Sequence, residues 1–199
     1  TPESIVDRLT LTSARIAGMV QGLRDLAALP DPVGDVIRGW KLPNGVSVRQ
    51  VRVPFGVIGI ISPWNFPIAI PAWKIAPALA FGNCVVVKPA DNTPGCSWAL
   101  VEILSRAGLP KGVVNLVMGR GSVVGETLLT HPDVVGVSFT GSVETGGHVA
   151  KTCAARGAKF QLEMGGKNPL VVLDDADLDT AVECAINGAF YSTGQRCTA

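Results

Sequence analysis

The sequence predicts an α/β fold in which a parallel sheet is covered by helices on both of its faces. Short, uninterrupted apolar runs recur from Gly56 onward, and segments in which apolar residues follow helical spacing separate them. Such runs are typical of strands buried on both faces, and their alternation with helices is the pattern of a parallel sheet with crossover connections. Glycine and proline, 23 and 14 of the 199 residues, mark the turns between segments without forming a repeat.

The chain before Gly56 predicts two elements outside this sheet. Apolar residues between Ile5 and Leu26 recur at helical spacing, which predicts one or two amphipathic helices over residues 3–28. The segment LPDPVGD then interrupts the pattern. Asn44-Gly45 is a tight-turn signal and the valines after it alternate with polar residues, so residues 41–53 are expected to form a β-hairpin arm.

Five apolar runs predict the strands of the sheet. In chain order they are GVIGII, CVVV, VVNLV, VVGVSF and KFQLE. The predicted helices between them cover residues 68–80, 94–107, 121–129 and 142–156. The second of these helices has the clearest boundaries, because Thr93 is a typical N-cap, Pro94 suits the first helical position and Gly108 is a typical C-cap.

A further α/β unit is expected to begin after Gly165-Gly166. The apolar run PLVVL leads there into a helix that is capped near Asp177 and extends to about Ser192. The predicted division of the chain is N-terminal helices over residues 1–40, the hairpin over 41–53, the main α/β domain over 54–163 and the start of a second domain over 164–199.

Charge and hydropathy exclude several classes of protein. The 17 basic and 16 acidic side chains give a net charge of +1, which argues against a basic face that binds nucleic acid or a membrane surface. A mean hydropathy of +0.35 is too high for a disordered chain. Residues 53–73 carry no charge, but the prolines within them exclude a single membrane-spanning helix.

Cysteine usage predicts a reducing compartment. The five cysteines are widely spaced and form no CxxC pair, so neither a disulfide framework nor a metal site is expected. The N-terminal segment TPESIVDRLT has no basic stretch followed by an apolar one, so no signal peptide is expected. The protein is therefore expected to be cytoplasmic.

Four motifs lie at the ends of predicted strands or in the turns after them, where open α/β sheets bind ligands. They are SPWNFP (62–67), VKPAD (87–91), FTGS (139–142) and LEMGGKNP (162–169), and GQRC (194–197) follows the last predicted helix. In order and separation these motifs resemble those of the NAD(P)-dependent aldehyde dehydrogenase superfamily, from about residue 50 to Ala199. The resemblance implies a Rossmann-like sheet that binds NAD or NADP, a small-molecule aldehyde substrate, and a hairpin arm that joins subunits into a homodimer or homotetramer.

The resemblance also implies three catalytic residues. Cys197 is expected to be the nucleophile that adds to the aldehyde carbonyl, and a cation beside it, Arg196, favours the thiolate. The side-chain amide of Asn65 and the backbone N–H of Cys197 are expected to donate to the developing oxyanion. Glu163, before a glycine turn, is expected to be the general base that activates water to hydrolyse the thioester. Without the motifs, these residues would be interpreted as a structural cysteine, a turn asparagine and an exposed glutamate.

A nicotinamide dinucleotide is expected at the strand ends by the same resemblance, although the sequence has no GxGxxG motif. Lys88 is expected to hold the adenosine ribose, and Ser142 to lie near the pyrophosphate at a helix N-terminus. Asp91 stands where many NAD-preferring relatives have glutamate, and its shorter side chain leaves NADP use open. The other cofactor-binding candidates are Ile61, Ser62, Pro63, Trp64, Ala90, Gly121, Gly125, Phe139, Thr140, Gly141, Leu162 and Gly165.

The sequence leaves two alternatives to a hydrolytic dehydrogenase open. The chain ends two residues after Cys197, so it is expected to be inactive alone, and a truncated, non-catalytic fragment that binds a dinucleotide or assists assembly is one alternative. A CoA-acylating aldehyde dehydrogenase is the other, and Glu163 argues against it because CoA-dependent relatives generally lack that base. His131 and His148 have no catalytic role by resemblance and are interpreted as structural or surface residues, and Lys167 is left open between a role in its motif and a solvated lysine.

The expected substrate is 2-oxoglutarate semialdehyde. The strings WKIAPALAFGNCVVVKPADNTP and YSTGQRCTA are similar to segments of bacterial family members that act on this aldehyde, also called 2,5-dioxopentanoate. Succinate semialdehyde and general aliphatic aldehydes stay open as alternatives.

Overall fold

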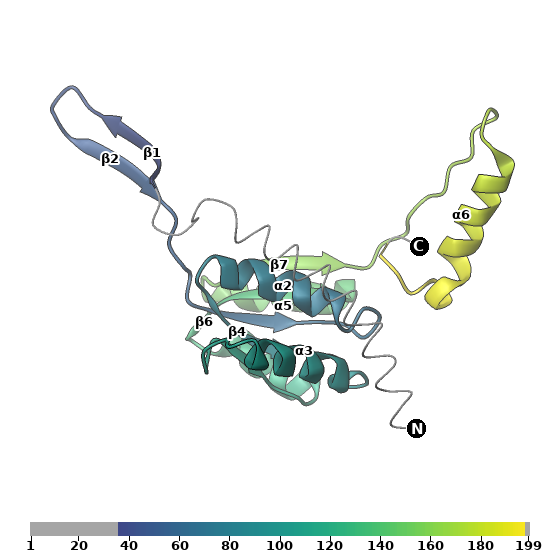
Figure 1. Ribbon diagram of the computed structural model, residues 1–199, viewed down its shortest axis with the longest axis horizontal. Helices are drawn as coiled ribbons and strands as arrows, with labels where there is room; N and C mark the ends of the chain where they lie inside the picture. The colour runs from purple at the N-terminus through teal and green to yellow at the C-terminus, as the bar shows by residue number, and fades with distance from the viewer. Residues whose placement is uncertain (1–35, 198–199) are drawn as a thin grey trace.

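The structure is a computed structural model that describes residues 36–197, so the helices predicted over residues 3–28 lie outside the described residues. Its centre is a parallel sheet of five strands in the order β5-β4-β3-β6-β7 (Figure 1). The strands are β3 (Val57–Ile61), β4 (Cys84–Lys88), β5 (Val114–Leu116), β6 (Val134–Gly141) and β7 (Lys159–Met164). Each of the five predicted runs forms one of them, which confirms the α/β class.

Helices cover both faces of this sheet. They are α2 (Ala69–Ala80), α3 (Pro94–Arg106), α4 (Glu126–Thr130) and α5 (Val143–Ala155). Helices α2 and α3 share a buried core with Ile60 of β3, whereas α4 and α5 share a second core with Phe139 of β6. Successive residues of a strand point to opposite faces, so Ile60 packs in the first core and Ile61 against the second.

Helix boundaries follow the polar residues and glycines of the sequence. Ser142 caps α5, because its Oγ accepts a hydrogen bond of 3.2 Å from the N–H of Thr145. Asp177 caps α6 (Leu178–Phe190) in the same way through Thr180, and this bond lowers the pKa of Asp177. Thr93 precedes α3 as predicted, but its hydroxyl makes no capping bond.

Two predicted segments have a different form. Residues 121–125 open the third predicted helix as a π-helical turn, η1 (Gly121–Gly125), which continues into α4. The run PLVVL forms no strand, and Leu170, Val171 and Leu173 are more than half exposed. Within residues 36–197 no strand pairs with this run, so its apolar side chains have no sheet to enter.

The hairpin arm stands clear of the sheet, as Figure 1 shows at the left of the molecule. Its strands β1 (Val36–Lys41) and β2 (Ser47–Val51) are antiparallel and join at Gly45, which has a φ of 83°. The arm starts at Val36, before the predicted boundary at residue 41. The sequence VIRGWK lacks the alternation that marks β2, so the pattern did not predict this first strand. No helix of the described residues is long and apolar enough to cross a membrane.

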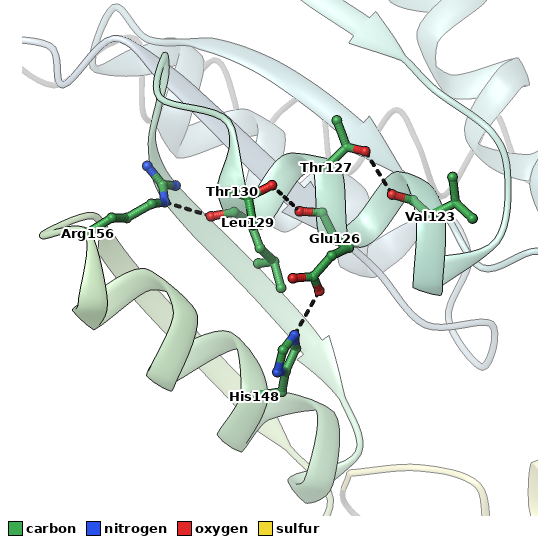
Figure 2. A network of polar contacts seen from close by, with 7 residues as sticks. All are labelled: Val123, Glu126, Thr127, Leu129, Thr130, His148 and Arg156. Carbon is green, nitrogen blue, oxygen red and sulfur yellow. Dashed lines mark hydrogen bonds and ion pairs between the residues drawn. The ribbon is translucent and has the colours of Figure 1, made fainter.

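A polar network fixes α4 against α5 (Figure 2). His148 of α5 contacts the Glu126 carboxylate at 2.8 Å, and Arg156 at the end of α5 donates to the carbonyl of Leu129 at 2.6 Å. The network also fixes the position of η1, which carries two of the cofactor-binding candidates, because η1 runs directly into α4.

Candidate active site

The sheet order creates a ligand-binding position between β3 and β6. From β3 the chain adds β4 and β5 on one side, and then β6 and β7 on the other. The carboxyl ends of β3 and β6 therefore flank the switch point at which open α/β sheets bind ligands. The register aligns Ile61 with Lys88 and Phe139, and Phe139 with Leu162, so these four candidates form one row across the sheet.

A cavity of about 1080 Å³ adjoins β6, β7 and α2. All three predicted catalytic residues line it, although Asn65 follows β3, Glu163 lies in β7 and Cys197 follows the short turn η2 (Tyr191–Gly194). Of the predicted cofactor residues it includes Pro63, Trp64, Thr140, Gly141, Ser142 and Gly165. The others, Ile61, Ser62, Lys88, Ala90, Asp91, Gly121, Gly125, Phe139 and Leu162, lie outside its lining.

The segment that carries Cys197 is held by two asparagine amides. Asn65 Nδ2 donates to the carbonyl of Gln195 at 2.8 Å, across 130 residues of sequence, and Asn168 Nδ2 donates to the carbonyl of Cys197. Ser192 and Thr193 have positive φ angles of 53° and 54°, which turn the chain back from α6 toward Asn65. Asn65 thus lies beside the backbone of the predicted nucleophile, while Asn168 was not identified from the sequence.

Lys74 is a second residue that sequence reasoning missed. From α2 its ammonium group donates to Ser138 Oγ at 2.8 Å, Gln161 Oε1 at 3.0 Å and the carbonyl of Phe139 at 3.3 Å. Burial lowers the pKa of Lys74 from 10.5 to about 8, and the charge of the nearby Glu163 opposes this shift. The predicted general base therefore has a fixed cation in the same cavity wall.

The two candidates for ribose binding contact each other. Lys88 Nζ lies 2.7 Å from Asp91 Oδ1 and 2.6 Å from the carbonyl of Pro89. The Lys88 side chain is 5% exposed and that of Asp91 51% exposed, so the acidic partner faces solvent at the end of β4. Ala90 forms the turn between them and accepts a hydrogen bond from the N–H of Thr93.

The strand ends fit a polar ligand. Ser62 Oγ, directly after β3, is buried and has no hydrogen-bond partner among the described residues. A buried polar group without a partner costs about 1–3 kcal/mol, which a hydroxyl or phosphate oxygen of a ligand would offset. The packing at the end of β6 requires glycine at position 141, because a Cβ there would lie 2.6 Å from the Phe139 ring.

Three further titratable side chains, His131, His148 and Lys167, differ in their position relative to the cavity. His131 and His148 do not line the cavity, whereas Lys167, whose role the sequence left open, does. Among residues 36–197 no group of three or more His, Cys, Asp or Glu side chains is arranged to hold a metal ion.

Known proteins have sequences similar to this chain. The model of the aldehyde dehydrogenase family matches residues 8–199. The α-ketoglutaric semialdehyde dehydrogenase of Bacillus subtilis is 59% identical over 148 residues, which are 74% of this chain and 30% of that protein. The 2,5-dioxopentanoate dehydrogenase of Saccharolobus solfataricus is 50% identical over 168 residues, 82% of this chain and 35% of that protein. The chain thus spans about a third of the length of these relatives.

Solved structures give the same result. Betaine aldehyde dehydrogenase from Staphylococcus aureus, in complex with NAD⁺, superimposes with a TM-score of 0.81 at 38% identity, over 91% of this chain and 35% of that one. An aldehyde dehydrogenase from Bacillus cereus, also an NAD⁺ complex, gives a TM-score of 0.80 at 36% identity, over 91% and 36% of the two chains. With a family match over nearly all of its residues, the chain belongs to the aldehyde dehydrogenase family.

Proposed function

We propose that this chain supplies the cofactor-binding part and the nucleophile of an NAD(P)-dependent aldehyde dehydrogenase that oxidises an aldehyde to a carboxylic acid. The observation that carries the proposal is the meeting of Asn65, Glu163 and Cys197 in one cavity at the carboxyl edge of the sheet. A soft nucleophile, an amide donor and a carboxylate are the three groups that this reaction needs.

In the proposed mechanism the Cys197 thiolate adds to the aldehyde carbon and forms a C–S bond. The carbonyl oxygen becomes an oxyanion, which accepts hydrogen bonds from the Asn65 amide and the Cys197 N–H. A nicotinamide dinucleotide, when bound, would supply the acceptor for the hydride that this carbon loses as the adduct becomes a thioester. Glu163 then removes a proton from a water molecule that attacks the thioester, the C–S bond breaks, and the carboxylic acid leaves with Cys197 again a thiolate.

Lys74 has a positioning role in this proposal. Its ammonium group is fixed by acceptors from both β6 and β7, and its charge acts on Glu163. A cation held in the cavity wall attracts the nearby carboxylate and so helps to position it.

The cofactor proposal rests on the residues at the strand ends. Lys88 and Asp91 together offer a donor and an acceptor for ribose hydroxyls, and Ser62 offers a hydroxyl without a partner. Ser142 and the free N–H groups at the start of α5 suit a pyrophosphate. We propose NAD as the cofactor, because the carboxylate of Asp91 would repel a 2′-phosphate, and NADP as the alternative.

The proposed substrate is 2-oxoglutarate semialdehyde. Two relatives at 59% and 50% identity are named for this aldehyde under its two names. Hydrolysis is favoured over transfer to CoA because Glu163 lines the same cavity as Cys197.

The test uses three variants of the full chain, meaning the whole enzyme to which these 199 residues contribute, because the 199 residues alone are expected to be inactive. Cys197→Ser is expected to abolish NADH formation, and Asn65→Ala to lower kcat about 10²- to 10³-fold, as loss of one oxyanion donor does. Glu163→Gln is expected to give one burst of NADH per nucleophile and then stop, because the thioester forms but is not hydrolysed. Cys184→Ser, a change at an exposed cysteine of α6 outside the cavity, is the control and should retain turnover.

Each of the two alternative functions predicts a different experimental result. Steady turnover of Glu163→Gln only when CoA is added would indicate the CoA-acylating alternative. Binding of NAD without NADH formation from any aldehyde would indicate the non-catalytic alternative.

A further inference from the structure

We propose that Arg196 determines substrate specificity by binding a carboxylate on the aldehyde substrate. The inference rests on the proposed function and adds to it the charge of the substrate and the residue that recognises this charge.

The cavity has an excess of positive charge. Its charged side chains are Lys74, Lys167, Arg196 and Glu163, three cations to one carboxylate. The whole chain is nearly balanced, with 17 basic and 16 acidic residues, so the excess is a local property of this cavity. A cavity of one predominant sign attracts ligands of the opposite sign. The cavity therefore suits an aldehyde that carries a negative charge.

Arg196 is the cation best suited to hold that charge. Lys74 already donates to three acceptors and lies near Glu163, so its charge is largely compensated. Lys167 makes no hydrogen bond or ion pair with the described residues and is exposed, so nothing there fixes its ammonium group. Arg196 is half-buried, and its Nη2 donates to the carbonyl of Asn187 in α6, which orients the guanidinium.

The guanidinium group of Arg196 also has unused donors. Its Nε is buried and has no hydrogen-bond partner among the described residues. An arginine carries five N–H donors in a planar fork, and a carboxylate is the acceptor that matches this fork with two parallel bonds. A carboxylate ligand would supply acceptors that the described part of the chain does not.

The position of Arg196 places it in the same site as the predicted nucleophile. It directly precedes Cys197, and both residues line the cavity. One substrate molecule can therefore contact Cys197 with its aldehyde group and Arg196 with a carboxylate. The substrate class that fits is an aldehyde that also carries a carboxylate.

The test compares a charged and a neutral aldehyde of equal length, succinate semialdehyde and butanal, in the full chain at saturating NAD. Arg196→Gln is expected to lower the ratio of kcat/KM for the charged aldehyde to that for the neutral one about 10- to 100-fold, the effect of losing hydrogen bonds to a charged group. Arg196→Lys should retain part of this ratio, because it keeps the charge but not the fork.

Two matched controls remove a cation elsewhere. Lys167→Gln removes a charge from the same cavity, and Arg106→Gln removes an exposed arginine of α3 outside it. Both should leave the ratio within about threefold of wild type, since exposed charges contribute little. An equal or larger change in Lys167→Gln would overturn the assignment to Arg196.

Three other results would also contradict the inference. Equal losses on both aldehydes in Arg196→Gln would show that Arg196 serves the thiolate of Cys197 instead. A weaker binding of NAD with an unchanged aldehyde ratio would show that it serves the cofactor. If neither the ratio of kcat/KM for the two aldehydes nor NAD binding changed, the role of Arg196 would be structural, through its hydrogen bond to Asn187 of α6.

A second readout does not depend on turnover. Glutarate is expected to protect Cys197 from alkylation by iodoacetamide in the wild type but not in Arg196→Gln, whereas neutral glutaramide protects neither. If the full chain oxidises no aldehyde but this pattern appears, the proposed function fails and the carboxylate site stands. If aldehydes are oxidised and glutarate protects both forms equally, the carboxylate site fails alone.

Discussion

Among single residues, Lys74 gives the clearest link between burial and pH. Its pKa is lowered by burial to about 8, whereas the same group in the unfolded chain has the ordinary value of 10.5. Below pH 8 both states carry the proton and the cost of burying the charge is fully present. Between pH 8 and 10.5 the unfolded state binds more protons, so the contribution of Lys74 to stability becomes more favourable as the pH rises.

Lys74→Met should remove this dependence. The free energy of unfolding of wild type minus that of the variant is expected to increase from pH 8 to pH 10.5 and to be flat below pH 7.5. Denaturant unfolding across this range measures it. Lys111→Met, at an exposed lysine after α3, is the control. The free energy of unfolding of this variant should differ from that of wild type by the same amount at every pH. A parallel curve for Lys74→Met as well would contradict the low pKa.

Lys74 also illustrates what a sequence cannot provide. Asn65, Glu163 and Cys197 were identified because each lies in a motif, and the structure brings all three to one cavity. A lysine in an apolar helix is ordinarily solvated. Its acceptors, Ser138 and Gln161, lie 64 and 87 residues further along the chain, and only the folded sheet, on which α2 packs over β3 and β4 beside β6 and β7, brings them together.

At the level of elements, the strands of the sheet were predictable from the sequence, whereas the form of the run PLVVL was not. β3 and β4 consist mainly of apolar β-branched residues, and each is bounded by glycine, asparagine or proline, so sequence alone located them. PLVVL has the same composition but forms no strand, because the described residues provide no neighbour with which it can pair. A strand depends on its partners, and a run of valines does not contain that information.

The start of α5 combines a structural and a proposed binding role in one hydroxyl. Ser142 Oγ caps the helix, so Ser142→Ala is expected to lower the free energy of unfolding by about 1 kcal/mol. Ser142→Asp and Ser142→Asn should both keep the cap, since all three side chains are good N-caps. Only the aspartate adds a negative charge at the helix end where the pyrophosphate is proposed to bind.

Titration of NAD against these variants separates the two roles. Ser142→Asp is expected to weaken NAD binding about tenfold or more through charge repulsion while retaining its stability. Ser142→Asn is the uncharged match, and its NAD affinity should stay closer to wild type than that of Ser142→Asp. Equal affinities for the aspartate and asparagine variants would mean that the pyrophosphate binds away from this helix.

At the scale of the whole molecule, the hairpin arm and α6 extend from opposite ends of the sheet (Figure 1). The arm exposes Leu42, Val46, Val48 and Val51, each between 41% and 49%. Apolar side chains gathered on a projecting element are typical of surfaces that bind another protein. We propose that this arm joins copies of the protein into a homodimer or homotetramer.

Val48→Asp tests this proposal, because burying an unpaired carboxylate at an apolar contact is costly. The full chain is expected to change from an oligomer to a smaller species, measured as a lower mass by light scattering after size-exclusion chromatography. Ser47→Asp adds the same charge to the neighbouring residue, whose side chain points to the other face of β2. It is expected to keep the oligomer if only the face of β2 that carries Val48 makes the contact. An oligomer of unchanged mass in Val48→Asp, with far-UV circular dichroism like that of wild type, would exclude this face of the arm from the interface.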